Sequence, residues 1–190
     1  MEIAGETPTR PWARGGGDCA VRTRGPRRDA RGAAAVIRTV AGFHLDVDGS
    51  WVAELSCLHG QHVRHQPPFR DRAWVTDEDG RAARIGSPIE CPLCDRAELP
   101  AGLVHVRTAG PFDDATLPAA LRRTHLVAER TWGLLRVLEG AVELVFETAT
   151  PVRLHLRAGD EQALPPGTPH LLRVDGPVRL AVDFLVRATI

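Results

Sequence analysis

The sequence predicts a mainly β (α+β) chain in which a small metal-stabilised β domain precedes a larger β-sandwich. Cysteines and histidines gather between residues 57 and 94, and these are the side chains that Zn²⁺ prefers. From residue 103 onward, short alternating apolar stretches recur with glycine and proline between them. This texture is typical of a sandwich or a small barrel.

The composition excludes several classes of protein. The 190 residues suffice for one medium or two small domains, and 24 basic residues balance 24 acidic ones. A balanced charge gives no general attraction to nucleic acid or to an anionic membrane. No apolar run approaches the roughly 20 residues of a membrane helix, and the N-terminus lacks the apolar region of a signal peptide. We therefore expect a cytoplasmic protein without a membrane partner.

Residues 1–36 form an arm rich in Arg, Gly and Pro whose apolar residues show no periodicity. Such a composition predicts a disordered segment. An arginine-rich arm could also bind nucleic acid, but four acidic residues among the arginines count against that interpretation. Cys19 lies in this arm, apart from the other cysteines.

The domain expected over residues 37–95 begins with a hairpin. A strand over 35–46, an Asp-Gly turn and a returning strand over 51–57 bring Cys57 to the end of that hairpin. A strand over 72–76, an acidic turn over 77–80 and a short amphipathic piece over 81–85 then lead to the pair Cys91 and Cys94. The domain has few large apolar side chains, so a bound metal would stabilise it. Residues 96–102 are the expected linker.

The simplest set of four metal ligands is Cys57, His59, Cys91 and Cys94. Two short ligand pairs separated by a loop suit a closed tetrahedral zinc site. His62 is an alternative to His59, because both follow Cys57 within a few residues. The competing interpretations are surface histidines and buried thiols without metal.

The same segment carries the patterns Gly-Phe-His-x-Asp, Gly-x-Trp-Val-Ala-x-Leu-x-Cys, His-x-Gln-His-x-Arg-His-x-Pro-Pro and Cys-Pro-Leu-Cys-Asp between residues 42 and 95. It therefore resembles a small bacterial domain of unknown function. The resemblance implies a metal site and no particular reaction. One departure is Leu58, which stands where that pattern has glycine.

Residues 103–190 are expected to form the sandwich. Strands are predicted over 103–107, 152–157, 162–164, 169–174 and 178–186, and a hairpin over 132–146 that turns at Glu139 and Gly140. Residues 117–126 fit either a helical turn or an extended edge.

Residues 159–170 follow the spacing G-x5-P-x-G-x2-H, which resembles the second cupin motif and would point His170 into the interior. The first cupin motif is broken, since Gly133, Glu129 and Val127 stand at its ligand positions.

Further segments match the cupin-like TehB/YeaR-type domain of tellurite-resistance proteins: 110–113, 117–121, His125, 131–140, 165–170 and Asp183 with Phe184. The resemblance implies a cupin-like jelly roll and a link to tellurite or reactive-nitrogen stress. His125, His170 and Asp183 would be candidates for a second divalent metal (Zn, Fe or Ni). Glu129 and His170 are candidates for contacting substrate. The alternative is that the two histidines line an interior that holds an organic ligand or nothing.

The function expected is that of a stress-related protein in which a zinc-stabilised module is fused to a cupin-like domain that binds a small molecule or a metal ion. The alternative is a cupin-type metalloenzyme, an oxygenase or isomerase acting on a small metabolite. A nucleic-acid-binding zinc ribbon would use Arg64, Arg70 and Arg72, but residues 37–95 hold more acidic than basic side chains. A homodimer through edge strands is a further expectation.

Overall fold

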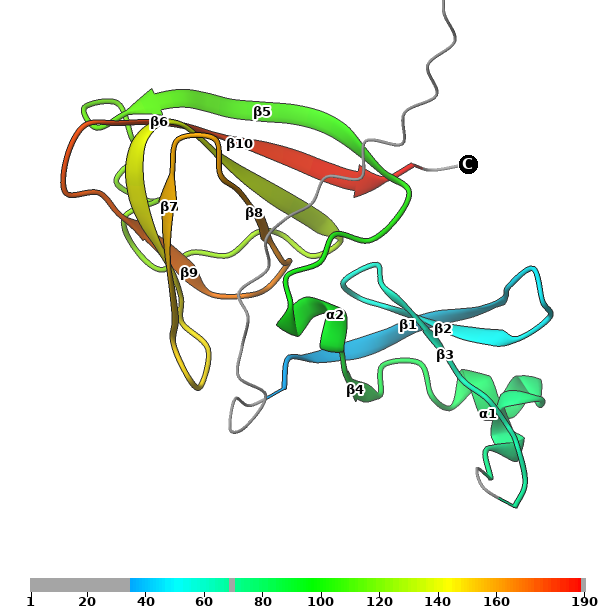
Figure 1. Cartoon of the computed structure of the whole chain (residues 1–190). Helices are drawn as coiled ribbons and strands as arrows, with labels where there is room; N and C mark the ends of the chain where they lie inside the picture. Colours follow the sequence, from blue (N-terminus) through cyan, green and yellow to red (C-terminus); the bar gives the residue numbers. More distant parts are fainter. Residues whose placement is uncertain (1–34, 69–70, 189–190) are drawn as a thin grey trace, which may run out of the picture.

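The computed structural model describes residues 35–68 and 71–188. Most of the expected arm, together with Cys19 and Arg70, lies outside these residues. The described chain forms two β-sheets, one built from the N-terminal half and one from the C-terminal half (Figure 1). The expectation of a small β domain followed by a β-sandwich is confirmed.

The N-terminal sheet has four strands in the order β3-β2-β1-β4. The elements of this half are β1 (Ile37–Leu45), β2 (Trp51–Leu55), β3 (Gly60–His62), the 3₁₀ helix η1 (Ala73–Val75), α1 (Glu78–Ala82), β4 (Pro88–Glu90) and α2 (Pro92–Asp95). The predicted hairpin is present, with β1 and β2 antiparallel. Asp46 closes its turn, because one carboxylate oxygen accepts hydrogen bonds from the backbone of Asp48 and Ser50.

The strand expected over 72–76 is wrong, since this stretch is the helix η1 followed by α1. The acidic run that suggested a turn is the start of a helix. The Asp77 side chain accepts a hydrogen bond from the Gly80 N–H at 2.8 Å, and Glu78 and Asp79 occupy the first turn. Negative side chains stabilise a helix N-terminus in this way.

The C-terminal half, which we call the sandwich, has a main strand order of β5-β10-β6-β7, and β8 and β9 also pair with β6. Its strands are β5 (Leu103–Asp113), β6 (Thr131–Phe146), β7 (Val152–Arg157), β8 (Glu161–Leu164), β9 (His170–Arg173) and β10 (Val178–Arg187). Residues 117–126 form turns, apart from an isolated bridge between His125 and His170.

The hairpin predicted over 132–146 is wrong, because β6 is one continuous strand that changes partners at Gly140. The part before Gly140 pairs with β10 and β8, and the part after it pairs with β7 and β9. Gly140 has φ of +74°, and a Cβ atom there would lie 2.1 Å from the carbonyl oxygen of Pro177. The glycine that suggested a turn therefore bends a strand shared by both layers of the sandwich.

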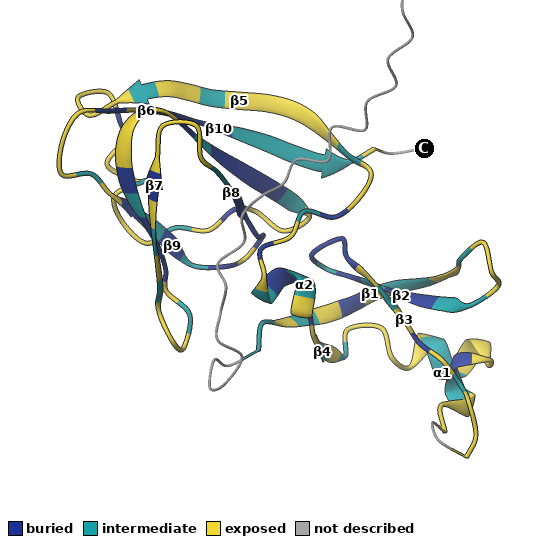
Figure 2. Cartoon of the chain, in the orientation of Figure 1, coloured by how far each residue is buried: buried dark blue, intermediate teal, exposed yellow. Residues whose placement is uncertain are grey.

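Most buried apolar residues of the described chain form two cores. One is internal to the sandwich and contains Leu135, Leu144 and Leu180, all buried. The other gathers buried residues of the N-terminal half and also includes Trp132 and Ala163 from the sandwich. Figure 2 shows the buried positions along β6 and near α2, whereas β5 is exposed over most of its length.

The two halves are therefore packed against one another. Arg187 of β10 pairs with Glu54 and donates to the carbonyl of Leu58, both at 2.6 Å. Arg38 donates to the Thr168 hydroxyl at 2.8 Å. Residues 96–102, expected to be a linker, take part in this packing through the buried Ala97 and the partly buried Leu99.

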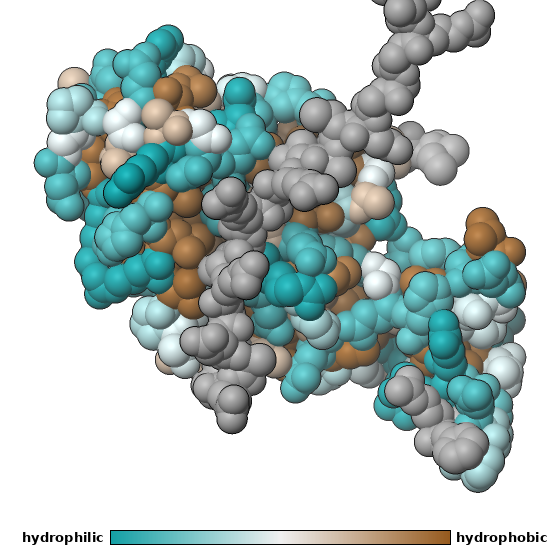
Figure 3. All heavy atoms as spheres, viewed as in Figure 1, coloured by the Kyte–Doolittle hydropathy of each residue, from teal (hydrophilic) through white to brown (hydrophobic). Residues whose placement is uncertain are grey.

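The face of the molecule drawn in Figure 3 is mostly hydrophilic with scattered apolar patches. Exposed large apolar side chains include Val47 at the tip of the first hairpin and Val106 on β5. Among the described residues, no helix is long and apolar enough to cross a membrane.

Candidate metal centre and sandwich cavity

Two tight local structures deliver the cysteines and the histidine of the first site. Cys57 and His59 lie in the turn between β2 and β3, which the Leu58 N–H closes onto the Leu55 carbonyl at 2.8 Å. Cys91 is the N-cap residue of α2 and Cys94 lies within that helix. Pro92 occupies the first turn of the helix, where its missing N–H costs nothing.

The four side chains converge on one point. Their ligand atoms all lie within 4.8 Å of one another. The Sγ atoms of Cys57 and Cys91 are 3.8 Å apart, and His59 Nδ1 lies 3.5 Å from Cys57 Sγ, 3.4 Å from Cys91 Sγ and 3.6 Å from Cys94 Sγ. A tetrahedral zinc ion bound at the usual lengths would separate two sulfurs by about 3.8 Å and a sulfur from a nitrogen by about 3.6 Å. The group could therefore hold a metal ion, and its dimensions suit zinc.

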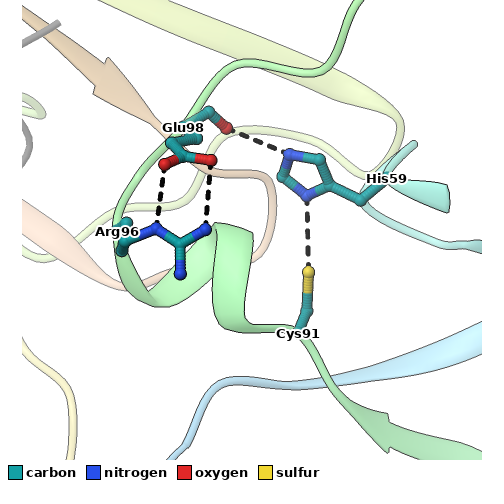
Figure 4. Close-up of polar contacts among 4 residues, drawn as sticks. All are labelled: His59, Cys91, Arg96 and Glu98. Atoms are coloured by element: carbon teal, nitrogen blue, oxygen red, sulfur yellow. Dashed lines mark hydrogen bonds and ion pairs between the residues drawn. The ribbon is translucent and has the colours of Figure 1, made fainter. Parts of the chain in front are cut away.

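A backbone carbonyl orients the His59 ring from the side opposite the cysteines. Nε2 lies 3.1 Å from the carbonyl oxygen of Glu98, so it donates there. A bound metal would replace the proton of Nδ1, the nitrogen that faces the sulfurs. Figure 4 shows the ring between Glu98 and Cys91, with the Glu98 carboxylate paired to Arg96. A ligand histidine ordinarily donates its second N–H to such a partner.

The electrostatics of the group favour a bound cation. Contacts with Cys57 and Cys94 hold the pKa of the Cys91 thiol far below its ordinary value, and contacts with Cys57 and Cys91 raise the pKa of Cys94. Burial lowers the pKa of His59, but the thiols of Cys57 and Cys91 outweigh it and raise that pKa to about 9. Several thiolates cannot share this space unless a positive charge lies among them. Arg38 Nε donates to Cys94 Sγ at 3.4 Å.

The centre is closed to substrate. All four residues are buried, with Cys57 and Cys91 at 0% exposure. The neighbouring cavity beside Cys94 measures about 10 Å³, which is about the space for one water molecule. A site with four protein ligands and no open position is structural rather than catalytic.

The remaining histidines of the cluster have other partners. His62 Nε2 lies 2.7 Å from a carboxylate oxygen of Asp46 on the exposed side of the sheet. His65 Nδ1 accepts a hydrogen bond from the Arg72 N–H. The structure thus brings His59 to the cysteines and places His62 elsewhere.

Leu58, which stands where the sequence pattern has glycine, adopts the left-handed conformation, with φ of +70° and a buried side chain. This conformation costs a residue other than glycine about 1–2 kcal/mol.

We expect Leu58→Gly and Leu58→Ala both to destabilise the protein, since each loses a buried side chain, but Leu58→Gly by about 1 kcal/mol less. Urea unfolding in the presence of zinc measures the difference.

The matched control for Leu58 is Leu55, which is equally buried but lies in β2. There alanine should be more stable than glycine, as is usual within a strand. If alanine is also the better replacement at Leu58, the strain at that position is absent.

The sandwich contains a second feature, a cavity of about 510 Å³. Its walls come from β5, β6, β8, β9, β10 and the turns over 118–128, and they are mainly apolar. The cavity falls within the usual range for small-ligand pockets, about 300–1,000 Å³.

His125 and His170 both line this cavity, with ring centroids 4.2 Å apart. Each ring points Nδ1 at a backbone carbonyl, that of Arg123 for His125 at 3.0 Å and that of Thr168 for His170 at 2.8 Å. Burial, aided by the nearby His125, lowers the pKa of His170 to about 4. His170 is therefore a neutral imidazole at physiological pH.

Asp183 does not join the two histidines. Its neighbours Val182 and Phe184 line the cavity, so by strand alternation Asp183 points to the opposite face. There its carboxylate pairs with Arg136 at 2.8 Å and accepts a hydrogen bond from the Thr108 hydroxyl at 2.6 Å. The expectation that His125, His170 and Asp183 meet is wrong for this reason.

Glu129 is exposed in the loop before β6 and does not line the cavity. It is therefore not placed to contact a ligand there. Arg107 does line the cavity, although no sequence pattern pointed to it. Trp132 was also overlooked, although its indole donates to the Cys57 carbonyl at 2.8 Å.

Two family models match the chain. Residues 41–98 match a protein family of unknown function (DUF3565), and residues 107–182 match the TehB-like domain. Both resemblances expected from the sequence are confirmed. The chain is thus a two-domain protein, with the cysteine and histidine group in the DUF3565 part and the cavity in the TehB-like part.

Similar solved structures cover the C-terminal half. A protein from E. coli (strain K12) has a TM-score of 0.45 and 23% identity over 48% of this chain and 98% of that protein. TehB from Haemophilus influenzae has a TM-score of 0.41 and 15% identity over 46% of this chain and 32% of TehB, so this chain spans about a third of TehB. A cupin-2 domain containing protein from Shewanella frigidimarina has a TM-score of 0.27 and 18% identity over 45% of this chain and 67% of that protein. The curated proteins include no significant match.

Proposed function

We propose that this is a stress-related protein in which zinc stabilises the DUF3565 part and the TehB-like sandwich binds a small molecule. The observation that carries the first half of the proposal is the convergence of four buried ligand atoms at tetrahedral spacing. The metal would be held by Cys57, His59, Cys91 and Cys94 and would act on stability, because the site is closed to substrate.

The small-molecule half of the proposal rests on the cavity. A concave, mainly apolar space with a few polar groups is the usual form of a ligand site. His170 is 1% exposed, and its Nε2 has no hydrogen-bond partner in the described chain. A buried acceptor without a partner is costly unless a ligand supplies the donor.

The metalloenzyme alternative has some support from the adjacent rings of His125 and His170. A metal there would have two imidazole ligands from this chain, since Asp183 faces away. The two proposals differ in metal content, because the second requires an additional Zn, Fe or Ni ion that survives loss of the cysteine site.

The metal proposal is tested by elemental analysis of purified protein with a pair of histidine variants. We expect one zinc per chain in the unaltered protein and in His62→Ala, and almost none in His59→Ala. The reason is that His59 Nδ1 faces the three sulfurs whereas His62 pairs with Asp46. Retention of zinc by His59→Ala, or loss of zinc from His62→Ala, would show that His59 is not the fourth ligand.

The proposed role in stress is drawn from the resemblance to the TehB-like domain. The stress in question is exposure to tellurite or to reactive species. Expression of the chain in a tellurite-sensitive bacterium should raise the inhibitory concentration of tellurite several-fold. A His170→Phe variant of equal abundance should not, because it alters the cavity. Equal protection by the unaltered chain and by His170→Phe would show that the stress role does not depend on the cavity.

A further inference from the structure

The polar groups in the cavity narrow the chemistry of its ligand. Among the described lining residues, those with polar side chains are Arg107, Thr131, His125 and His170, and none is acidic. The remaining lining residues are apolar. A ligand must therefore offer an apolar body to most of the wall and complementary polar groups at a few points.

His170 requires a donor from the ligand. A carbonyl oxygen can only accept, so the 2.8 Å contact with the Thr168 carbonyl places the ring proton on Nδ1. Nε2 then holds a lone pair, and it is buried without a protein partner in the described chain. Phe146 packs beside the ring with centroids 6.0 Å apart, so this nitrogen lies in apolar surroundings.

The ring proton of His125 is also placed on Nδ1 by a backbone carbonyl. Its Nδ1 lies 3.0 Å from the Arg123 carbonyl, which leaves Nε2 as the nitrogen that can face the cavity. The main chains of His125 and His170 also exchange two hydrogen bonds of 3.0 Å, which hold the two rings together. Both rings that line the cavity therefore carry their free acceptor on Nε2.

Arg107 supplies the positive charge. Its guanidinium carbon lies 3.8 Å from the centroid of the Phe184 ring, which also lines the cavity. Stacking on an aromatic ring restricts a guanidinium while leaving its N–H groups free to donate. No carboxylate of the described residues forms an ion pair with Arg107. The charge therefore favours an anionic group on the ligand.

We infer that the cavity binds an amphipathic acid, a compact apolar molecule whose hydroxyl donates to the buried His170 Nε2 and whose carboxylate pairs with Arg107. This inference rests on the proposal that the sandwich binds a small molecule, and it adds the class of that molecule. Neither histidine is required to hold a metal.

The test is calorimetric titration of the full-length, zinc-loaded protein with three probes. These are para-hydroxyphenylacetate, which carries both groups, phenylacetate, which lacks the hydroxyl, and para-hydroxyphenylethanol, which lacks the carboxylate. We expect para-hydroxyphenylacetate to bind about tenfold more tightly than phenylacetate, since the latter leaves the buried acceptor unpaired. It should bind about fivefold more tightly than the alcohol, because the Arg107 pair is exposed to solvent.

Two variants assign these preferences to residues. His170→Phe should abolish the preference for the hydroxyl and keep that for the carboxylate. Arg107→Gln should do the reverse, and Arg179→Gln is its matched control, an exposed arginine on β10 that pairs with Glu139 and does not line the cavity. The probe comparison on unaltered protein stands even if His170→Phe fails to fold.

The outcomes separate the inference from the proposed function. Equal affinities for all three probes would overturn the amphipathic acid while leaving small-molecule binding intact. Saturable binding of a neutral apolar probe such as toluene without binding of the three would have the same meaning. No binding of toluene or of any of the three would overturn the small-molecule proposal itself.

Discussion

Replacing Cys91 by serine is expected to remove the zinc and unfold the DUF3565 part of the chain. The apparent binding free energy of structural zinc is about 10–16 kcal/mol in small zinc domains, which matches or exceeds the whole stability of most domains, about 5–15 kcal/mol. Cys91 Sγ lies against both Cys57 Sγ and His59 Nδ1, so its loss breaks up the group of four ligands. Zinc content and limited proteolysis of the purified variant measure the two effects, and a strong chelator should reproduce them in the unaltered protein.

Cys19→Ser is the matched control for this change, since it removes a cysteine that is not one of the four converging residues. We expect it to retain one zinc and the same protease resistance as the unaltered protein. The sandwich should persist in Cys91→Ser, because its internal core contains none of the four residues. A Cys91→Ser variant that stays folded without metal would show that the apolar core suffices.

The second large effect is expected at Trp132. This side chain belongs to β6 but is wholly buried in the N-terminal core, where its ring packs edge-on to His59 with centroids 5.3 Å apart. Truncating a buried tryptophan costs about 3–5 kcal/mol. We expect Trp132→Ala to lower stability by about this amount. We also expect it to divide thermal unfolding into two transitions, because the packing of the Trp132 ring in the N-terminal core is lost.

Trp132→Phe separates the hydrogen bond of the indole from its packing. It keeps an aromatic ring but leaves the Cys57 carbonyl without its donor, which costs about 1–3 kcal/mol. Scanning calorimetry should show one transition at a lowered temperature for this variant. A single, unshifted transition in Trp132→Ala would mean that the two halves are joined elsewhere, for example through Arg187 and Glu54.

The sequence was a good guide where the signal is local. The alternation of apolar residues predicted most strands of the sandwich, and the hairpin before Cys57 followed from its Asp-Gly turn. Local signals led to wrong predictions where the same residue type is common in two kinds of structure. Gly140 suggested a hairpin although it bends β6, and Asp77 suggested a turn although it caps α1.

For the candidate sites too, some features followed from the local sequence and others only from the tertiary structure. Residue type and spacing were enough to select Cys57, His59, Cys91 and Cys94, because thiols and imidazoles in short pairs have few other uses together. Nothing local distinguished His59 from His62. That distinction comes from the Glu98 carbonyl, which orients the His59 ring from 39 residues away.

The amino-acid sequence by itself determined the chemistry of this protein: a group of soft metal ligands before residue 95 and a β-sandwich carrying His170 after residue 103. Only the tertiary structure decided which groups act together. Strand pairing turned Asp183 away from His170 and brought Arg107 to the same cavity, and packing placed Trp132 against Cys57. These relations depend on contacts between distant segments, and side-chain direction in a strand reverses with each residue.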